Sequence, residues 1–315
     1  MKKKRTFLSK IVRFLIVLCI IVGAAGYLLT DYIHGKMNYS GIPSVSMEPL
    51  KEDGVTNVLL IGNDSREAGE DGRSDAMILL SISNETKTIH LTSLLRDMYV
   101  EIPGHDGNRL NAAYAYGGPE LLMETIEKNF DIEVNRYMLV NFQAFAHLVD
   151  AVGGVELEVT NEEVKYINAY LVEYNMLEGN ETGTDYLDET LSGTIHLNGP
   201  QALAYCRNRY LGTDFGRTER QRKVLTAAIK NAPKALLGNP LELLNSILPM
   251  LTTNLTQAEI GSLFLQAPNF LVYDIIQGSI PIEDSYSNAS IRGMSVLEVD
   301  FEMNNEYIQQ NIYGK

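Results

Sequence analysis

The chain has 315 residues, of which 26 are Lys or Arg and 40 are Asp or Glu, so that its formal net charge is -14. With 45% hydrophobic residues it can bury a sizeable core, but no broad basic surface is available, which excludes the usual electrostatics of a nucleic-acid-binding protein. The two cysteines, Cys19 and Cys206, are not expected to meet, and the five histidines form no HExxH motif, so neither a disulfide nor a cysteine metal site is expected.

The N-terminus combines a basic flank with an apolar run from Phe14 to Leu29. That run is long enough to span a bilayer if the helix begins a few residues earlier, and the basic flank predicts that residues 1–13 stay in the cytoplasm. A cleaved signal peptide is the alternative, because residues 23–26 are small. We favour an uncleaved anchor at residues 14–30, since the segment continues apolar through Leu29. The rest of the chain would then lie outside the cell membrane.

A polar tether at residues 31–54 leads to the first predicted strand, the apolar run Val58–Ile61. Two further strands are predicted at residues 76–82 and 88–94, joined as a hairpin by the polar turn between them. Helices follow at 119–129 and 142–151, and a strand at 155–159.

The second half of the chain is more helical. Residues 161–195 are polar and are expected to form a long surface excursion. Predicted helices and one late strand follow, and this alternation of strands and helices favours a layered α/β domain. We expect residues 55–235 to form the catalytic domain and residues 236–315 to pack on it. The predicted helices cover 199–205, 218–230 (ended by Pro233), 241–248 and 256–266, and the strand covers 270–276.

Two aspartates flank neighbouring strands. Asp64 directly follows the first strand and Asp75 directly precedes the second, and loops at strand ends are where ligand sites gather in α/β proteins. Two carboxylates can hold one magnesium ion and leave positions open for a substrate phosphate. On composition alone, however, turn-capping carboxylates paired with Arg66 and Arg73 are the favoured interpretation.

Other charged residues follow the third strand and precede a glycine pair. Arg96 and Asp97 would reach the same edge of the sheet, although an ordinary surface ion pair gives the same pattern. Arg109 stands ahead of Gly117 and Gly118, where the backbone could approach a ligand. A plain helix lead-in is equally compatible with that stretch.

Five arginines stand close together in this acidic chain. Because the planar guanidinium binds phosphate oxygens bidentately, the cluster indicates a local site for a dense negative charge such as pyrophosphate. The cluster consists of Arg207, Arg209, Arg217, Arg220 and Arg222.

The spacing of these arginines sorts them. Arg207 and Arg209 would face one side of an extended backbone, while Arg217 and Gln221 would share a helical face. Arg222, with the lysine after it, is expected to turn toward solvent.

An apolar stripe recurs at helical spacing and is most simply core. A groove for a lipid tail could use the same face, and the spacing alone does not separate the two. The stripe comprises Leu121, Leu122, Ile126, Phe142, Phe145, Leu148 and Val149.

Seven motifs in this order resemble the LytR-CpsA-Psr family of bacterial envelope proteins, over roughly residues 55 to 232. The chain departs from the family pattern at Arg109, where lysine is usual, and at Leu95, where proline is usual. The latter departure concerns the local turn more than the chemistry. The matching stretches are Leu60–Arg66, Arg73–Asp75, Ser93–Asp97, Arg109–Gly118, Val149–Val155, Leu197–Arg209 and Asp214–Gln221.

The resemblance implies a three-layer α-β-α sandwich around a central mixed β-sheet, preceded by one transmembrane helix. It implies a phosphotransferase that moves an anionic glycopolymer, such as teichoic acid or capsular polysaccharide, from a polyprenyl-pyrophosphate carrier to peptidoglycan. It also implies Mg²⁺, or Mn²⁺ in its place, on Asp64 and Asp75. The implied pyrophosphate-binding set is Arg73, Arg96, Arg109, Arg207, Arg209, Arg217 and Gln221.

Three questions remain open at this stage. Asp75 or Asp97 could deprotonate the acceptor hydroxyl. A pyrophosphatase acting on the same lipids would use the same metal and arginines with water as nucleophile. A non-catalytic regulator that binds lipid-linked precursors is the third alternative, although paired metal carboxylates argue against it.

Overall fold

The computed structural model describes residues 26, 28–40, 51–52, 54–63, 74–208, 210–238, 244–245 and 247–315. Its centre is a sheet with the strand order β1-β11-β8-β3-β4-β5-β12, to which β2 adds by pairing with β3. The strands of this sheet are β1 (Asn38–Tyr39), β2 (Lys51–Glu52), β3 (Val55–Asn63), β4 (Ser74–Ser83), β5 (Thr88–Leu94), β8 (Tyr137–Asn141), β11 (Leu251–Thr253) and β12 (Asp274–Ile280).

The pairing within the sheet is mixed. β3, β4 and β5 are antiparallel neighbours, which confirms the predicted hairpin, whereas β8 and β12 lie parallel to β3 and β5. Three short antiparallel pairs lie outside this sheet: β6 (Tyr99–Val100) with β7 (Asn108–Arg109), β9 (Val155–Val159) with β10 (Gly193–Leu197), and β13 (Tyr286–Ile291) with β14 (Met294–Val299).

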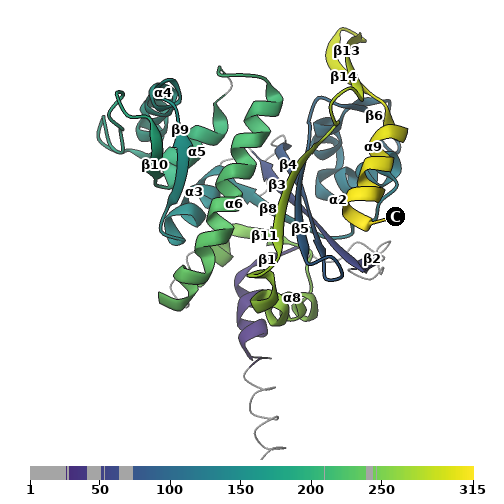
Figure 1. The fold of residues 1–315 in the computed structure, drawn as a ribbon, viewed down its shortest axis with the longest axis horizontal. Coiled ribbons are helices and arrows are strands. Elements are labelled where there is room, and N and C mark those ends of the chain that lie inside the picture. The colour runs from purple at the N-terminus through teal and green to yellow at the C-terminus, as the bar shows by residue number, and fades with distance from the viewer. Residues whose placement is uncertain are drawn as a thin grey trace, which may run out of the picture.

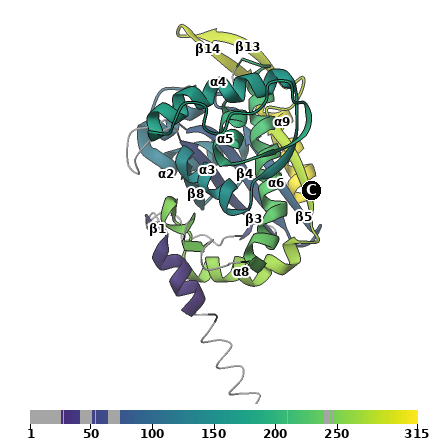
Figure 2. The same cartoon turned by 90° about the vertical axis from the view of Figure 1, so that its left-hand side faces the viewer.

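Helices cover both faces of the sheet, so the predicted layers around a mixed sheet are confirmed. In Figures 1 and 2, α3, α5 and α6 lie on one face with α4 outside them, and α2 and α9 lie on the other. Each side has its own apolar core. The helices are α2 (Leu110–Phe130), α3 (Phe142–Ala151), α4 (Asn161–Glu178), α5 (Gly199–Arg207), α6 (Asp214–Gly238), α8 (Gln257–Phe270) and α9 (Phe301–Ile308), with short turns η1 (Leu248–Met250) and η2 (Gln309–Tyr313).

The two faces of β3 are packed unequally. Side chains alternate between faces along a strand, and Leu59 and Ile61 are at most 1% exposed in the core beneath α2. Leu60 and Gly62, on the opposite face, are only partly buried. The sheet face beneath α3, α5 and α6 is therefore incompletely filled by side chains.

The polar stretch expected as a surface excursion begins instead with a helix, α4. Thr160 and Glu163 form a capping box at its start, and Val164, Ile167 and Leu171 are fully buried at spacings of three and four residues. This narrow apolar stripe packs against α5 and was hidden by the polar residues around it. The excursion prediction was therefore wrong for residues 161–178.

Two further boundaries differ from expectation. α6 begins at Asp214 and continues through Pro233 to Gly238, because tertiary packing can outweigh the lost hydrogen bond and the steric clash that a proline brings to a helix. The late strand lies at 274–280 rather than 270–276, since residues 271–273 form the turn after α8 and pairing with β5 sets the register. The β13–β14 hairpin and α9 were not predicted.

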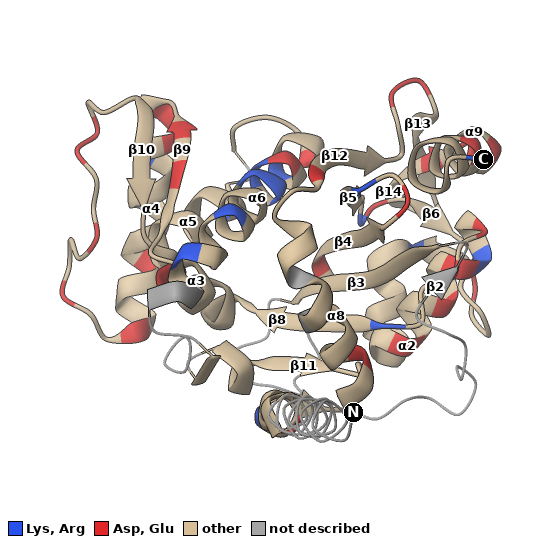
Figure 3. Cartoon of the chain, turned by 60° about the horizontal axis from the view of Figure 1, so that its bottom comes forward, with Lys and Arg blue, Asp and Glu red and all other residues tan. Residues whose placement is uncertain are grey.

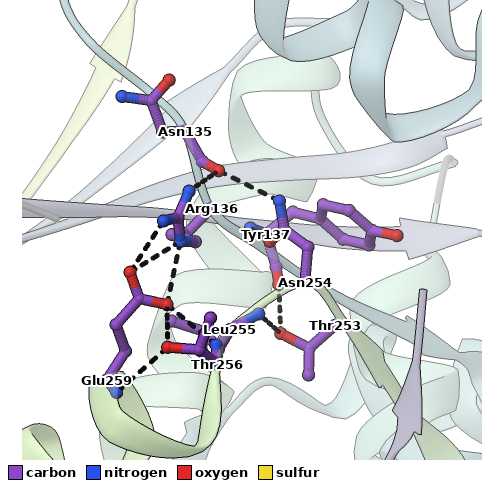
Figure 4. Close-up of polar contacts among 8 residues, drawn as sticks. All are labelled: Asn135, Arg136, Tyr137, Thr253, Asn254, Leu255, Thr256 and Glu259. Carbon is purple, nitrogen blue, oxygen red and sulfur yellow. Dashed lines mark hydrogen bonds and ion pairs between the residues drawn. The ribbon is translucent and has the colours of Figure 1, made fainter. Parts of the chain in front are cut away.

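A buried ion pair attaches α8 to the sheet (Figure 4). Arg136, just before β8, is 3% exposed, and its Nε donates to both carboxylate oxygens of Glu259 at 2.9 and 3.0 Å. Its Nη1 donates to the carbonyl oxygen of Asn135 at 2.8 Å. Glu259 also accepts the N–H and hydroxyl of Thr256, the helix cap, at 2.8 and 2.9 Å. The start of α8 and the start of β8 are thereby held together.

The predicted anchor at residues 14–30 lies almost entirely outside the described residues. A helical segment at residues 28–36 is described, and its Ile33 packs with Leu251, Leu255 and Ile260. Within the described ranges, no helix is both long enough and apolar enough to cross a membrane.

Candidate active site

The predicted charged residues meet at one edge of the sheet. Asp75 is the second residue of β4, and Arg96 and Asp97 follow the end of β5. Because β4 and β5 are antiparallel, with Ile78 opposite Ser93, the start of one strand lies beside the end of the other. Asp75 Oδ1 accepts a hydrogen bond from Arg96 Nη1 at 2.6 Å. The charge-assisted bond fixes the guanidinium at the strand ends.

Asp214 connects this pair to the arginine run. It is the first residue of α6, and its Oδ1 lies 3.7 Å from Arg96 Nη2 and 3.1 Å from Arg217 Nη2. Arg96 Nε is also 3.6 Å from Asp97 Oδ2. We call Asp75, Arg96, Asp97, Arg109, Asp214 and Arg217 the charged network. Asp214 was not among the predicted site residues, although its place three residues ahead of Arg217 in the last motif was a usable signal.

Arg109 belongs to the network from a different side. Its Nε lies 3.4 Å from Asp97 Oδ1, and both its Nε and Nη2 donate to the carbonyl oxygen of Ser295, at 3.0 and 2.7 Å. Ser295 lies on β14, so this arginine joins the network to the C-terminal hairpin.

The network shifts the ionisation of its members. Burial alone would lower the pKa of Arg96, but the carboxylates of Asp75, Asp214 and Asp97 outweigh it and leave that pKa raised. Burial raises the pKa of Asp97, a hydrogen bond with Asp214 adds to this, and the nearby arginines only partly oppose it. Asp97 is therefore a more basic carboxylate than an exposed one.

α6 directs its arginines in three directions. Arg217 is 3% exposed and faces the network, whereas Arg220 donates from Nη2 to the carbonyl oxygen of Asn208 at 2.6 Å. Arg222 is 7% exposed and donates from Nη1 to Ser93 Oγ at 2.7 Å. The expectation that Arg222 turns to solvent was wrong, because α6 crosses β5 and β12 and that flank of the helix is covered. Figure 3 shows these basic positions along the first half of α6.

An apolar cavity of about 160 Å³ lies between the sheet and α3, α5 and α6. On the sheet it is bounded by the paired residues Gly62 and Ala76. A Cβ at Gly62 would lie 3.1 Å from that of Ala76, so both positions must be small for this face to stay open. Phe142, Phe145 and Leu148 of the predicted apolar stripe line it, whereas Leu122 and Ile126 belong to the opposite core.

Three residues with polar side chains, Asn141, Arg207 and Gln221, also line this cavity. Arg207 is the last residue of α5, so the expectation of extended backbone at Arg207 was wrong, while Arg209 lies outside the described residues. The Arg207 guanidinium lies 4.1 Å from the ring centre of Phe142. Gln221 Oε1 is buried and accepts no hydrogen bond from any residue that the structure describes. Gln221 is one turn from Arg217 on α6, which connects the cavity with the charged network.

Leu95, where the family usually has proline, uses the N–H that proline would lack. That N–H donates to the carbonyl oxygen of Ile280, the last residue of β12, at 2.9 Å. The substitution therefore ties the segment carrying Arg96 to the end of β12.

Three predicted site residues, Asp64, Arg73 and Arg209, lie outside the described residues. Over the ranges that are described, no group of three or more His, Cys, Asp or Glu side chains gathers to hold a metal ion. Asp75 is nevertheless a suitable oxygen donor at the strand ends, and magnesium typically takes only one or two protein carboxylates beside substrate phosphates. The donor chemistry of this edge thus fits such an ion.

A layered α/β fold in which an apolar cavity adjoins an arginine-rich edge is typical of a protein that handles an amphiphile with an anionic head. The chain belongs to the LytR_cpsA_psr family, whose sequence pattern matches residues 30–311. It is 33% identical over 249 residues, 73% of the chain, to the polyisoprenyl-teichoic acid--peptidoglycan teichoic acid transferase TagU of Oceanobacillus iheyensis, and covers 71% of that relative.

Solved structures agree with this membership. A structure of TagT bound to LI-WTA superposes with a TM-score of 0.65 at 26% identity, over 88% of this chain and 99% of that one. A structure of YwtF (TagT) with bound octaprenyl pyrophosphate lipid gives 0.63 at 25% identity, with the same coverage.

Proposed function

We propose that the protein transfers an anionic glycopolymer of the teichoic acid class from a polyprenyl-pyrophosphate carrier to peptidoglycan. The observation that carries the proposal is the apolar cavity lined at Arg207 and Gln221 and connected through α6 to the charged network. A ligand that fits both parts has a long apolar tail and a strongly anionic head. The related transferase and the lipid-bound structure support this choice of substrate.

The cavity would take the part of the polyprenyl tail nearest the head group. Its walls are almost entirely aliphatic and aromatic, so burying isoprene units there removes apolar surface from water. A cation–π contact with Phe142 would position the Arg207 guanidinium, whose N–H groups would donate to phosphate oxygens.

The arginines would hold the pyrophosphate and stabilise the charge that develops on the departing group. Phosphoryl transfer depends on positioning and charge neutralisation more than on covalent chemistry from the protein. Arg96 and Arg217 both lie at Asp214, so their guanidinium groups are oriented before the substrate arrives. Arg207 and Gln221 would contact the head group from the cavity side. Arg73 and Arg209 are proposed members of the same set.

Asp97 is the proposed general base, because burial raises the pKa of its carboxyl and makes it a stronger proton acceptor than an exposed carboxylate. The acceptor hydroxyl oxygen bonds to the phosphorus that carries the glycan, and its proton passes to Asp97. The bond from that phosphorus to the bridging oxygen breaks, and the bridging oxygen leaves with polyprenyl phosphate. Asp75, held by Arg96, orients that arginine at the reacting phosphate.

Asp75 and Asp64 would hold Mg²⁺, or Mn²⁺ in its place, which would supply neutralisation of the pyrophosphate charge. We further propose that residues 14–30 anchor the chain in the cytoplasmic membrane with its catalytic part outside. The position of the helical segment 28–36, at the bottom of Figure 1 and beside α8, is compatible with an anchor leading away from the body.

Filling the cavity tests the proposal. Ala76→Leu adds a branched side chain where only small residues fit. The KM for a polyprenyl-pyrophosphate-linked saccharide should therefore rise about tenfold or more. Ala112→Leu, on α2 and on the other side of the sheet, is the control for a core change of the same kind. The readout is transfer of radiolabelled glycan to peptidoglycan by the full chain in detergent micelles. Free glycan phosphate as the only wild-type product would contradict transfer and indicate a hydrolase.

A further inference from the structure

A second, polar cleft of about 470 Å³ lies between the charged network and the C-terminal hairpin. The network and the start of α6 form one wall, and β13 and β14 form the other. The apolar cavity and this cleft share no lining residue. The side chains that matter for its chemistry are Arg96, Asp97, Asp214, Tyr286, Asn288 and Ser295.

The hairpin is docked on the network by contacts from three elements. The Leu297 N–H donates to the carbonyl oxygen of Asp97 at 2.9 Å. Arg109 Nη2 donates to the carbonyl oxygen of Ser295 at 2.7 Å. The ring of Phe215, in the first turn of α6, lies 5.1 Å from the ring of Tyr286. The cleft is therefore built into the fold, with a wall fixed to the residue proposed as general base.

One face of β13 points into the cleft. Tyr286 and Asn288 alternate along the strand and so lie on the same face, whereas Ser287 lies on the other. Asn288 stands opposite Leu297 of β14, which also lines the cleft. Asn288 and Ser295 are exposed and available to a ligand. The wall thus offers an aromatic surface, an amide and a hydroxyl side by side.

The charges in the cleft are already balanced. Two arginines face two aspartates, with Arg96 3.6 Å from Asp97 and 3.7 Å from Asp214, and Arg109 3.4 Å from Asp97. In the proposed function Arg96 is taken up by the pyrophosphate, and Arg109 is held by Asp97 and by the carbonyl oxygen of Ser295, so a second anionic ligand would find no unpaired cation among the side chains that line the cleft. A neutral ligand with many hydroxyl and amide groups can bond to the carboxylates, Asn288 and Ser295 while a sugar face packs on Tyr286.

We propose that this cleft binds the acceptor, as a neutral amino-sugar chain that presents one hydroxyl to Asp97. The inference rests on the proposed transfer function and adds the place on this chain where the second substrate binds. The hairpin lies at the end of the molecule opposite the helical segment 28–36 (Figures 1 and 2), which suits a polymer that approaches from the side away from the lipid anchor.

The chain has no tryptophan, which makes a direct binding test possible. Tyr286→Trp places a single fluorescent indole on the cleft wall, and a soluble N-acetylglucosamine oligosaccharide is the probe. We expect a saturable change in its emission, and no change for Ser287→Trp on the opposite face. Adding Asn288→Ala to Tyr286→Trp should weaken binding about two- to tenfold, the effect of one hydrogen bond. Equal responses from the two tryptophan variants, or none from either, would overturn the proposal.

Kinetics of the full chain provide a second readout that does not need the reporter. Asn288→Ala should raise the acceptor KM about two- to tenfold, with a much smaller effect on the KM of the lipid-linked donor. Ser287→Ala is the matched control and should change neither. Unfolding midpoints of both variants identify any loss of fold.

The two assays separate the inference from the function on which it rests. Wild-type transfer without oligosaccharide binding at Tyr286→Trp would reject the cleft and leave the transfer function standing. Oligosaccharide binding without any transfer from the lipid-linked donor would reject the transfer function instead.

Discussion

Two arginines, the buried Arg136 and the partly buried Arg96, illustrate different uses of the same side chain. Arg136 meets one carboxylate, Glu259, through contacts of 2.7 to 3.0 Å from its Nε and Nη2, and its Nη1 donates to a backbone carbonyl oxygen. Arg96 is shared among Asp75, Asp97 and Asp214 at 2.6, 3.6 and 3.7 Å, so only one contact is within hydrogen-bond distance. Each guanidinium nitrogen of Arg136 therefore has a partner within hydrogen-bond distance, whereas Arg96 keeps N–H donors that a ligand could use.

One of these arginines stabilises the fold, and the other is available to a substrate. The Arg136 pair joins β8 to α8 and serves the fold (Figure 4), since the side chains of Arg136 and Glu259 are only 4% and 16% exposed. The Arg96 group stands at an open cleft, with a side chain 20% exposed. Breaking the Arg136–Glu259 pair should therefore affect mainly stability, and removing Arg96 should affect mainly catalysis.

The largest expected effect is on stability. Glu259→Met leaves the Arg136 charge buried and unpaired, which should lower the free energy of unfolding by about 3–5 kcal/mol. Replacing both partners, as Arg136→Met with Glu259→Met, should cost much less than the sum of the single changes. Urea unfolding of the four proteins in the cycle measures this. Additive losses would show that the two side chains do not depend on each other.

The next effect is on rate rather than stability. Arg96→Gln removes a positioned charge from the reaction site and should lower the transfer rate about 100- to 1,000-fold. The unfolding midpoint of Arg96→Gln should change little, because Arg96 is partly exposed and only one of its three carboxylate contacts is within hydrogen-bond distance. Arg292→Gln is the matched control, since Arg292 pairs with Asp106 at 2.9 Å on the exposed hairpin tip. A destabilised Arg96→Gln protein would remove the contrast between the two arginines.

The smallest expected effect is on acid stability. Burial would raise the pKa of Glu259, but hydrogen bonds from Arg136 and Thr256 outweigh it and leave the pKa below its usual value of 4.5. Because the pKa of Glu259 is lower in the folded than in the unfolded state, the pair contributes its full stabilisation above the unfolded-state pKa. That stabilisation is lost as the pH falls through the folded-state pKa. The urea midpoint should thus fall between about pH 6 and about pH 3 by more in the wild type than in Glu259→Gln. Parallel curves would contradict this.

Periodicity predicted the elements with strong local signals. The β4–β5 hairpin, α3 and β9 have the expected positions because apolar spacing and turn residues mark them. α4 was missed because its buried stripe is only one residue wide per turn. The register of β12 depends on its pairing with β5, a contact between distant segments that local spacing does not encode.

The candidate site shows the same limit. Motifs identified Asp75, Arg96, Asp97 and Arg217, which the structure joins in one network, but not Asp214, which connects them. Arg222 was misplaced because its burial depends on β12 lying beside β5, and Arg207 because a helix end was taken for extended backbone. Which residue types gather was predictable, and which face they present required the tertiary structure.

The contact between Leu95 and Ile280 has a consequence for the order in which the protein becomes competent. A chain is synthesised from its N-terminus, so its N-terminal segments become available for folding first. Asp75, Arg96 and Arg217 emerge early, but the strand that holds Leu95 ends at Ile280 and the hairpin that contacts Asp97 ends at Val299. A chain stalled before these segments would have its arginines without the support of β12 or the second wall of the cleft. Assembly of the reaction site therefore depends on segments as late in the sequence as Ile280 and Leu297.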